Sequence, residues 1–318
     1  MGVEFGQYLQ FVIPSLFQMA TLNPEMSISG TTAIGDISDV LSEIKPESSD
    51  DKEKKININT DEIEEKDVAI QMLAVFIDEL GAVFAPYVEH ASKIMLALID
   101  YEANDSIRNS VAGALPGLIK CVKNADPSAT AQILALARVF LEKLFETIKK
   151  ETETDCLICQ VQSAKEIIDE LGENTGLLNQ DAVIGLSQLL IDQYNKSDER
   201  IQENNELAKN QTQTEDEDEQ FDEDDLEVIK EENNNEYDFQ HSIAEIIGIL
   251  FKTHGPLCGD LINQLINVIL PPVLNCGEKQ KTKFGLFVMD DMVEYLGPEL
   301  LGPLYIQIAQ QIIKFCNS

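Results

Sequence analysis

The sequence predicts an all-α fold of stacked antiparallel helix pairs, and a repeated pentapeptide is the main observation behind that prediction. Ile77-Asp78-Glu79-Leu80-Gly81 recurs 91 residues later as Ile168-Asp169-Glu170-Leu171-Gly172, and a degenerate copy is Val293-Glu294-Tyr295-Leu296-Gly297. Each glycine ends an amphipathic helical pattern, as a C-cap glycine does, and Gly255 is a further stop 42 residues before the last one. Units of about 40–47 residues are typical of HEAT-type repeats. Runs with strand-like alternation are short, so we expect a HEAT-repeat α-solenoid forming part of a right-handed superhelix.

Apolar residues at helical spacing predict the elements in order. The first helix runs from Tyr8 to Leu22 and has no partner before it. The later segments are expected to form consecutive pairs: Asp61–Gly81 with Phe84–Tyr101, Asp105–Lys123 with Ser128–Lys150, Thr154–Gly172 with Asp181–Tyr194, Tyr237–His254 with Leu257–Leu274, and Lys279–Gly297 with Pro298–Phe315. The helix that begins at Asp181 can continue through the polar stretch Lys196–Asn210. We therefore expect residues 1–318 to form a single array that is truncated at both ends.

Two polar segments interrupt this pattern and are expected to be mobile insertions. The first, 23–60, is rich in serine and aspartate. The second, 211–236, includes Glu215–Glu232, where 12 acidic residues accompany a single lysine. Neither composition buries enough apolar surface to offset the entropy lost on ordering.

The charge of the chain limits its partners. The formal net charge is −34, from 57 acidic and 23 basic residues. About half of this charge lies outside the two most acidic stretches, Asp36–Glu65 and Glu215–Glu232. Such a surface repels nucleic acid and anionic membranes and favours basic proteins, although the same acidity also serves solubility. No signal peptide and no apolar run of membrane-spanning length are expected, so we predict no membrane insertion.

No catalytic, cofactor-binding or metal-binding constellation is predicted, and an enzyme is disfavoured. The three histidines, His90, His241 and His254, match no zinc-protease spacing, and no glycine-rich phosphate loop is present. Cys156 and Cys159 lie one helical turn apart, but the next cysteine is 99 residues further on, so four zinc ligands are lacking. These thiols are interpreted as core residues.

A contact between repeats is indicated near Asp105. In HEAT arrays an aspartate at a turn and an arginine in the following helix often form a ladder between repeats, and Asp105 and Arg108 fit that pattern. The alternative is an ordinary helix that Asp105 caps and whose arginine is solvated.

Several segments together resemble the importin-β superfamily of nuclear transport receptors, and within it the karyopherin beta-3 (importin five) group. They are Tyr8–Ile13 followed by Asn23-Pro24-Glu25, Asp105–Arg108, and the run Lys283–Tyr295 with its Gly-Leu and Asp-Asp pairs. The acidic stretch Glu215–Glu232 also stands where that family carries one, a repeat earlier. The order and spacing agree along nearly all 318 residues, as in a C-terminal-half fragment of such a receptor. The chain departs from the family in lacking tryptophan and in the insertion 23–60.

The resemblance implies a nuclear import receptor that shuttles between cytoplasm and nucleus. Its partners would be basic cargo of the histone or ribosomal-protein type, Ran GTPase and nucleoporins, with Ran-GTP-dependent release of cargo in the full-length protein. Eight carboxylates are the candidate partner-binding residues: Asp216, Glu217, Asp218, Glu219, Asp222, Glu223, Asp224 and Asp225. A disordered linker is the alternative for this segment, and a HEAT scaffold, such as a phosphatase regulatory subunit, is the alternative function.

Overall fold

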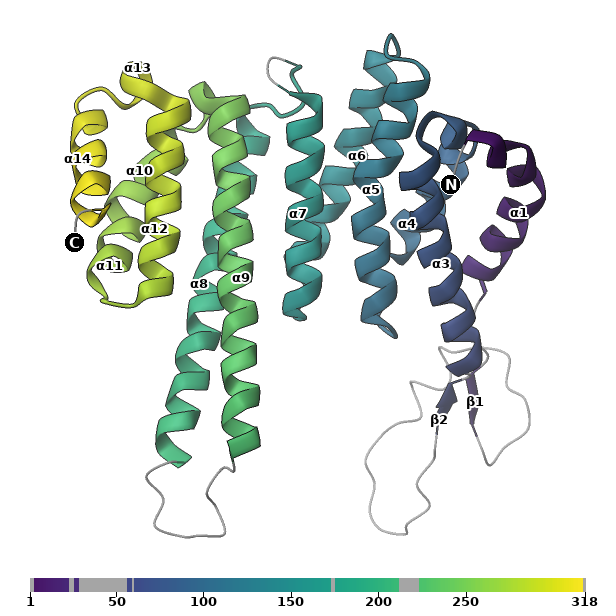
Figure 1. Ribbon diagram of the computed structural model, residues 1–318, viewed down its shortest axis with the longest axis horizontal. Helices are drawn as coiled ribbons and strands as arrows, with labels where there is room; N and C mark the ends of the chain where they lie inside the picture. The colour runs from purple at the N-terminus through teal and green to yellow at the C-terminus, as the bar shows by residue number, and fades with distance from the viewer. Residues whose placement is uncertain are drawn as a thin grey trace.

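The computed structural model describes residues 3–22, 26–28, 56–58, 60–172, 175–211 and 223–316. These residues form two layers of helices that stack side by side along the long axis of the molecule (Figure 1). One layer consists of α3 (Thr60–Leu80), α5 (Asp105–Ala125), α7 (Thr154–Leu171), α9 (Glu223–His254) and α12 (Lys279–Asp291), each packed against the next. The all-α prediction is confirmed.

The second layer covers one side of the first. Its main helices are α1 (Leu9–Ala20), α4 (Val88–Leu98), α6 (Thr130–Ile148), α8 (Gln180–Gln211), α10 (Gly259–Gln264), α11 (Leu270–Asn275) and α14 (Leu304–Cys316). Short helical segments join them: η1 (Val3–Tyr8), η2 (Gly81–Tyr87), η4 (Gly255–Leu257), η5 (Leu265–Ile269), η6 (Met292–Leu296) and α13 (Gly297–Leu301). Apolar side chains between the layers form one continuous core, with Leu73, Leu115 and Phe140 fully buried.

The glycine stops of the pentapeptide are confirmed, but Gly255 is a different case. Gly81, Gly172 and Gly297 have φ of 49°, 68° and 62°, in the left-handed region that favours glycine. Gly255 is not among the positive-φ glycines of the described chain. A Cβ there would lie 3.1 Å from Leu296 Cδ2, so this glycine serves close packing between helices.

Predicted helix pairs such as α5 with α6 and α12 with α14 are in contact, and second-layer helices also pack against the first-layer helix of the next pair. α1 packs against α3, α4 packs against α5, and α8 packs against α9. α7 therefore does not pair with the helix that follows it, but lies between α5 and α9 and meets α6 in the second layer. Each first-layer helix buries more than one side, so an apolar stripe alone does not identify which neighbour covers it.

The structure also corrects the two insertions. Within 23–60, β1 (Met26–Ile28) and β2 (Ile56–Ile58) form an antiparallel pair, with Ser27 opposite Asn57, and the rest of that segment lies outside the described residues. The acidic segment is helical from Glu223 onward, where the sequence predicted an insertion over 211–236. As foreseen, α8 continues through the polar stretch to Gln211, and α8 and α9 project beyond the stack as a two-helix arm (Figure 1).

The ladder between repeats is present and includes Arg108 as predicted, but the partner is Glu151 rather than Asp105. Arg108 donates to both oxygens of Glu151, at 2.9 and 3.3 Å, and to the carbonyl of Tyr101 at 3.1 Å. Both side chains of this ion pair are at most 10% exposed. Asn104, not Asp105, caps α5 by accepting from the Ile107 amide.

One expectation about membranes is corrected as well. Within the described residues, the stretch Asp61–Leu98 is long and apolar enough to cross a membrane by length and composition. It spans nearly all of α3 together with η2 and α4, and 39% of its apolar window is buried inside the stack.

Candidate functional site

The arm formed by α8 and α9 is held together by polar contacts. Arg200 of α8 donates to both oxygens of Glu236 of α9, at 2.7 and 2.8 Å, and Thr154 at the start of α7 donates to the same carboxylate at 2.7 Å. Further out, the Asn204 amide donates to Asn233 at 3.1 Å. Glu236 is only 4% exposed, so its charge is buried and depends on Arg200 for compensation.

A groove of about 400 Å³ lies where the arm leaves the stack, between the α6–α7 loop and the two arm helices. We call it the acidic groove. It is lined by Thr152, Glu153, Thr154, Asp155, Arg200, Glu203, Asn204, Glu232, Asn235 and Glu236. Five of these ten side chains are carboxylates, and the single arginine is already paired with Glu236. The groove therefore presents unbalanced negative charge at a concave site, which attracts Lys and Arg side chains.

The stack presents its carboxylates differently, because neighbouring lysines pair with them. Lys123 of α5 bonds Glu170 of α7 at 2.7 Å, and Lys165 of α7 bonds Glu245 of α9 at 2.9 Å. Lys252 of α9 returns to Asp169 of α7 at 2.7 Å. These cross-helix pairs neutralise six charges on the exposed face between α5 and α9.

The structure describes only three of the eight predicted site residues. Asp216, Glu217, Asp218, Glu219 and Asp222 lie outside the described residues. Glu223, Asp224 and Asp225 lie in the first turn of α9, at the tip of the arm. They lie at the opposite end of the arm from the acidic groove, so the structure does not bring them into that groove.

Sequence reasoning missed the carboxylates of the groove. Glu153 and Asp155 precede and begin α7, Glu203 is on α8, and Glu232 and Glu236 are on α9. No local motif joins residues so far apart in the chain. The available signal was the spacing of positions 226, 229, 233, 236 and 240, which alternates between three and four residues as in a helix-pairing seam.

Cys156, Cys159 and His254 behave as packing residues. Burial, followed by the nearby charge of Glu151, raises the pKa of the Cys156 thiol to about 12, so this thiol is protonated and poorly nucleophilic. Cys159 Sγ contacts the Asn109 carbonyl at 3.2 Å. Desolvation lowers the pKa of His254, so burial favours the neutral form of its ring. Over the ranges that the structure describes, no cluster of three or more His, Cys, Asp or Glu residues could hold a metal ion.

Comparison with known proteins gives a sequence relative and a consistent set of structural neighbours. The chain is 26% identical over 254 residues to Importin subunit beta-3 of Saccharomyces cerevisiae, which covers 77% of this chain and 21% of that protein. No family model matches. Solved structures of Kap121p superpose with a TM-score of 0.70: that of the complex with the SUMO protease Ulp1p is 20% identical and covers 98% of this chain, and that with Nup53p gives the same values.

The chain spans about a quarter of the length of these structural neighbours, 27% of Kap121p in both complexes. At this identity the superpositions show the fold, which is that of karyopherin HEAT-repeat solenoids, and the sequence match agrees with them. The resemblance of the chain to the importin-β superfamily of karyopherins is confirmed by these comparisons.

Proposed function

We propose that this chain is a C-terminal-half portion of a nuclear import receptor and that its acidic groove binds Lys/Arg-rich segments of cargo. The observation that carries the proposal is the groove itself, where the single arginine pairs with one of five carboxylates and leaves an excess of four. Basic cargo of the histone or ribosomal-protein type supplies the complementary charge. A folded arm with a groove at its base is better organised for this contact than a disordered linker.

The family and its neighbours support the wider role. Kap121p has been solved with Ulp1p and with the nucleoporin Nup53p, so that protein binds such partners. We propose the same kinds of partner for this chain, with shuttling between cytoplasm and nucleus. In the full-length receptor, Ran-GTP binding releases the cargo. Pull-downs comparing histones, ribosomal proteins, and Ran loaded with GTP or GDP test these partners directly.

A charge-matched set of variants tests the groove. Glu153→Gln, Glu203→Gln and Glu232→Gln together should weaken binding of a Lys-rich localisation peptide by about tenfold, since three exposed pairs contribute roughly 0.2–1 kcal/mol each. The control carries Glu64→Gln, Glu65→Gln and Glu299→Gln, which remove the same charge from exposed sites elsewhere. It should lose less than about twofold, because only long-range attraction falls.

The measurement is fluorescence anisotropy at low and physiological salt. Affinity for the unaltered chain should fall as salt rises, and the groove variant should show a flatter dependence. Equal loss in the two triple variants would show that the groove is not the contact. Salt-independent binding would instead favour the alternative, a scaffold that joins partners through apolar surfaces.

A further inference from the structure

The loop between α6 and α7 lies between two buried ion pairs. On the side of the stack, the Glu151 carboxylate pairs with Arg108 of α5, and on the side of the arm, Glu236 pairs with Arg200. The segment Thr152–Asp155, which forms one wall of the acidic groove, follows Glu151 directly. The position of this wall therefore depends on how the two carboxylates are held.

Glu151 is the centre of the contact on the side of the stack, because its carboxylate accepts five hydrogen bonds. Its Oε2 accepts from Arg108 Nε at 2.9 Å and from the Gln160 amide of α7 at 3.2 Å. Its Oε1 accepts from Arg108 Nη2 at 3.3 Å and from the main-chain N–H groups of Thr152 and Glu153 at 3.0 and 3.1 Å. The side chain is 8% exposed, so little water competes for these bonds. One carboxylate thus joins α5 and α7 to the main chain of the groove wall.

The wall is fixed at its main chain, while its Glu153 carboxylate remains available to the groove. Glu153 is the last residue before α7, and its side chain makes no capping hydrogen bond. Its N–H is bonded to Glu151, and its carbonyl accepts from the Leu157 amide at 3.0 Å. The next residue, Thr154, donates to Glu236 at 2.7 Å, so the wall is also attached to the arm.

Stability alone does not account for the charged pair. Burying an ion pair costs desolvation free energy, and its replacement by apolar residues of similar volume is often neutral or stabilising. Here a second cost is added, because Gln160 is fully buried and its Oε1 has no hydrogen-bond partner among the described residues. The pair supplies something that apolar side chains lack, which is an acceptor for the two amides of the loop.

We propose that Arg108 and Glu151 are positioning residues for the acidic groove, although neither of them lines it. Arg108 orients the Glu151 carboxylate, the carboxylate holds the main chain at Thr152 and Glu153, and the held main chain sets where Glu153 and Asp155 stand relative to the arm. This role rests on the proposed function, since it concerns the shape of the groove that binds basic segments.

Replacing the charged pair by an apolar pair separates positioning from stability. Arg108→Met with Glu151→Leu leaves the net charge unchanged, because one charge of each sign is removed. The free energy of unfolding in urea should be unchanged or higher. Affinity for the Lys-rich localisation peptide should fall by about three- to tenfold, because the released wall must be ordered again on binding. The loss should appear in the dissociation rate, since the association rate follows the unchanged net charge.

The matched control removes another ion pair between the same two helices. Lys123 of α5 pairs with Glu170 of α7 at 2.7 Å, near the opposite ends of both helices from Arg108 and Glu151. Lys123→Met with Glu170→Leu also leaves the net charge unchanged. Peptide affinity should change by less than about twofold, because this pair is distant from the groove.

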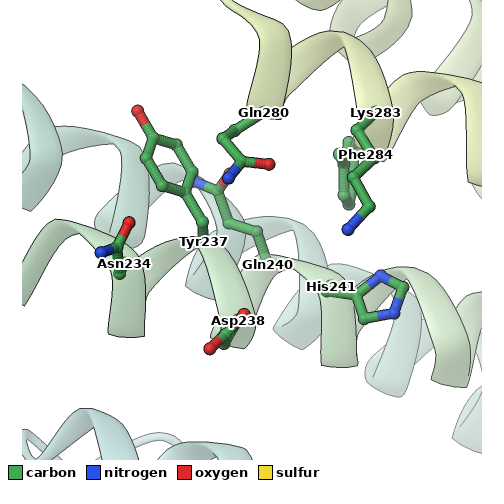
Figure 2. A pocket seen from close by; sticks show the side chains of 8 residues that line it. All are labelled: Asn234, Tyr237, Asp238, Gln240, His241, Gln280, Lys283 and Phe284. Carbon is green, nitrogen blue, oxygen red and sulfur yellow. The ribbon is translucent and has the colours of Figure 1, made fainter. Parts of the chain in front are cut away.

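The pocket between α9 and α12 does not complicate the measurement. Its volume is about 200 Å³, and Figure 2 shows that its lining sets Asp238 of α9 against Lys283 of α12. One carboxylate against one ammonium group leaves no excess of negative charge between them. A Lys-rich peptide is therefore expected to report on the acidic groove.

The amide protons of Thr152 and Glu153 report on the loop without any partner. Their exchange with water should be about tenfold faster in the Arg108→Met, Glu151→Leu variant, the effect of one lost hydrogen bond to a charged group. If the unaltered chain does not bind the peptide, the proposed function fails, and the exchange rates alone decide whether the pair holds the wall.

Two results would overturn the positioning role. One is equal exchange of the two amides in the variant and the unaltered chain, and the other is a loss of peptide affinity no larger than in the control. Should the apolar variant unfold, Arg108→Lys decides the matter, because it keeps the charge and removes the two-pronged contact with Glu151. It should speed exchange of the same two amides, and unchanged exchange would again overturn the role.

Discussion

The stack and the arm use the same side-by-side packing of helices but fill the interface with different chemistry. Between α5, α6 and α7 the facing residues are apolar and fully buried, such as Leu118, Phe140 and Ile167. Between the outer halves of α8 and α9 they are Ser197, Asn204 and Asn233, with few apolar residues beyond Ile201. The stack therefore has most of the stabilising apolar burial, while the arm exposes polar groups that a partner can use.

The charges of the two regions differ in the same way. In the stack, lysines on neighbouring helices pair with several of the exposed carboxylates between α5 and α9, as Lys123 does with Glu170. In the arm the carboxylates exceed the available bases, and Arg200 is committed to Glu236. Net charge alone therefore does not locate a binding surface, because the pairing of the charges decides which of them remain for a partner.

The largest effect that would test this comparison is a cavity in the stack. Phe140→Ala removes a fully buried ring and should lower the free energy of unfolding by about 3–5 kcal/mol. Leu207→Ala on the arm, where the side chain is 51% exposed, should change it by less than about 0.5 kcal/mol. Urea denaturation followed by circular dichroism measures both, and similar losses would show that the arm is as tightly packed as the stack.

A smaller, pH-dependent effect tests the acidic end of the stack. Asp291 of α12 packs over Gly248 of α9, where a Cβ would collide with the carboxylate. Burial, followed by the charges of Asp290, Glu294 and Glu245, raises the pKa of Asp291 to about 6. The folded state thus binds this proton more readily than the unfolded state, whose pKa is about 3.9, so stability falls as the pH rises from about 4 to 6 and stays lower above that.

Asp291→Asn removes this penalty and should stabilise the chain at pH 7 by about 1–2 kcal/mol, with no gain near pH 4. Asp260→Asn on α10 is the matched control at an exposed site and should show no such pH dependence. Thermal melts across this pH range provide the measurement. A gain that is equal at both pH values would show that the effect comes from packing rather than from charge.

Features coded by local sequence were predictable. The glycines that end α3 and α7 were correctly identified, because a left-handed C-cap depends on one residue and its immediate neighbours. The continuation of α8 through Lys196–Asn210 was also correctly foreseen. The pairing of α7 was not, since several of its sides are buried and only tertiary packing decides among them.

Only the sign of the charge at the candidate site could be predicted from the sequence. The excess of acid pointed to a basic partner, but the predicted residues lay in the run from Asp216 to Asp225. Because this run is so densely charged, the seam positions Leu226, Ile229 and Asn233 were not recognised as part of the helix that pairs with α8. The groove joins Glu153 to Glu236 across the fold, and no pattern within a short window contains that contact.

The smallest expected effect concerns the polar seam of the arm. Asn204 donates to Asn233 at 3.1 Å, and Asn233 donates to Asn205 at 3.2 Å. Paired asparagines at a helix interface fix the register at a cost in stability, so Asn204→Leu with Asn233→Leu should stabilise the arm by about 0.5–1 kcal/mol. Hydrogen exchange of arm amides measures this change locally, with amides of α5 as an internal reference. Faster exchange in the arm of the double variant would show that the asparagines hold the two helices together, and that the arm depends on its polar contacts as the stack depends on its apolar core.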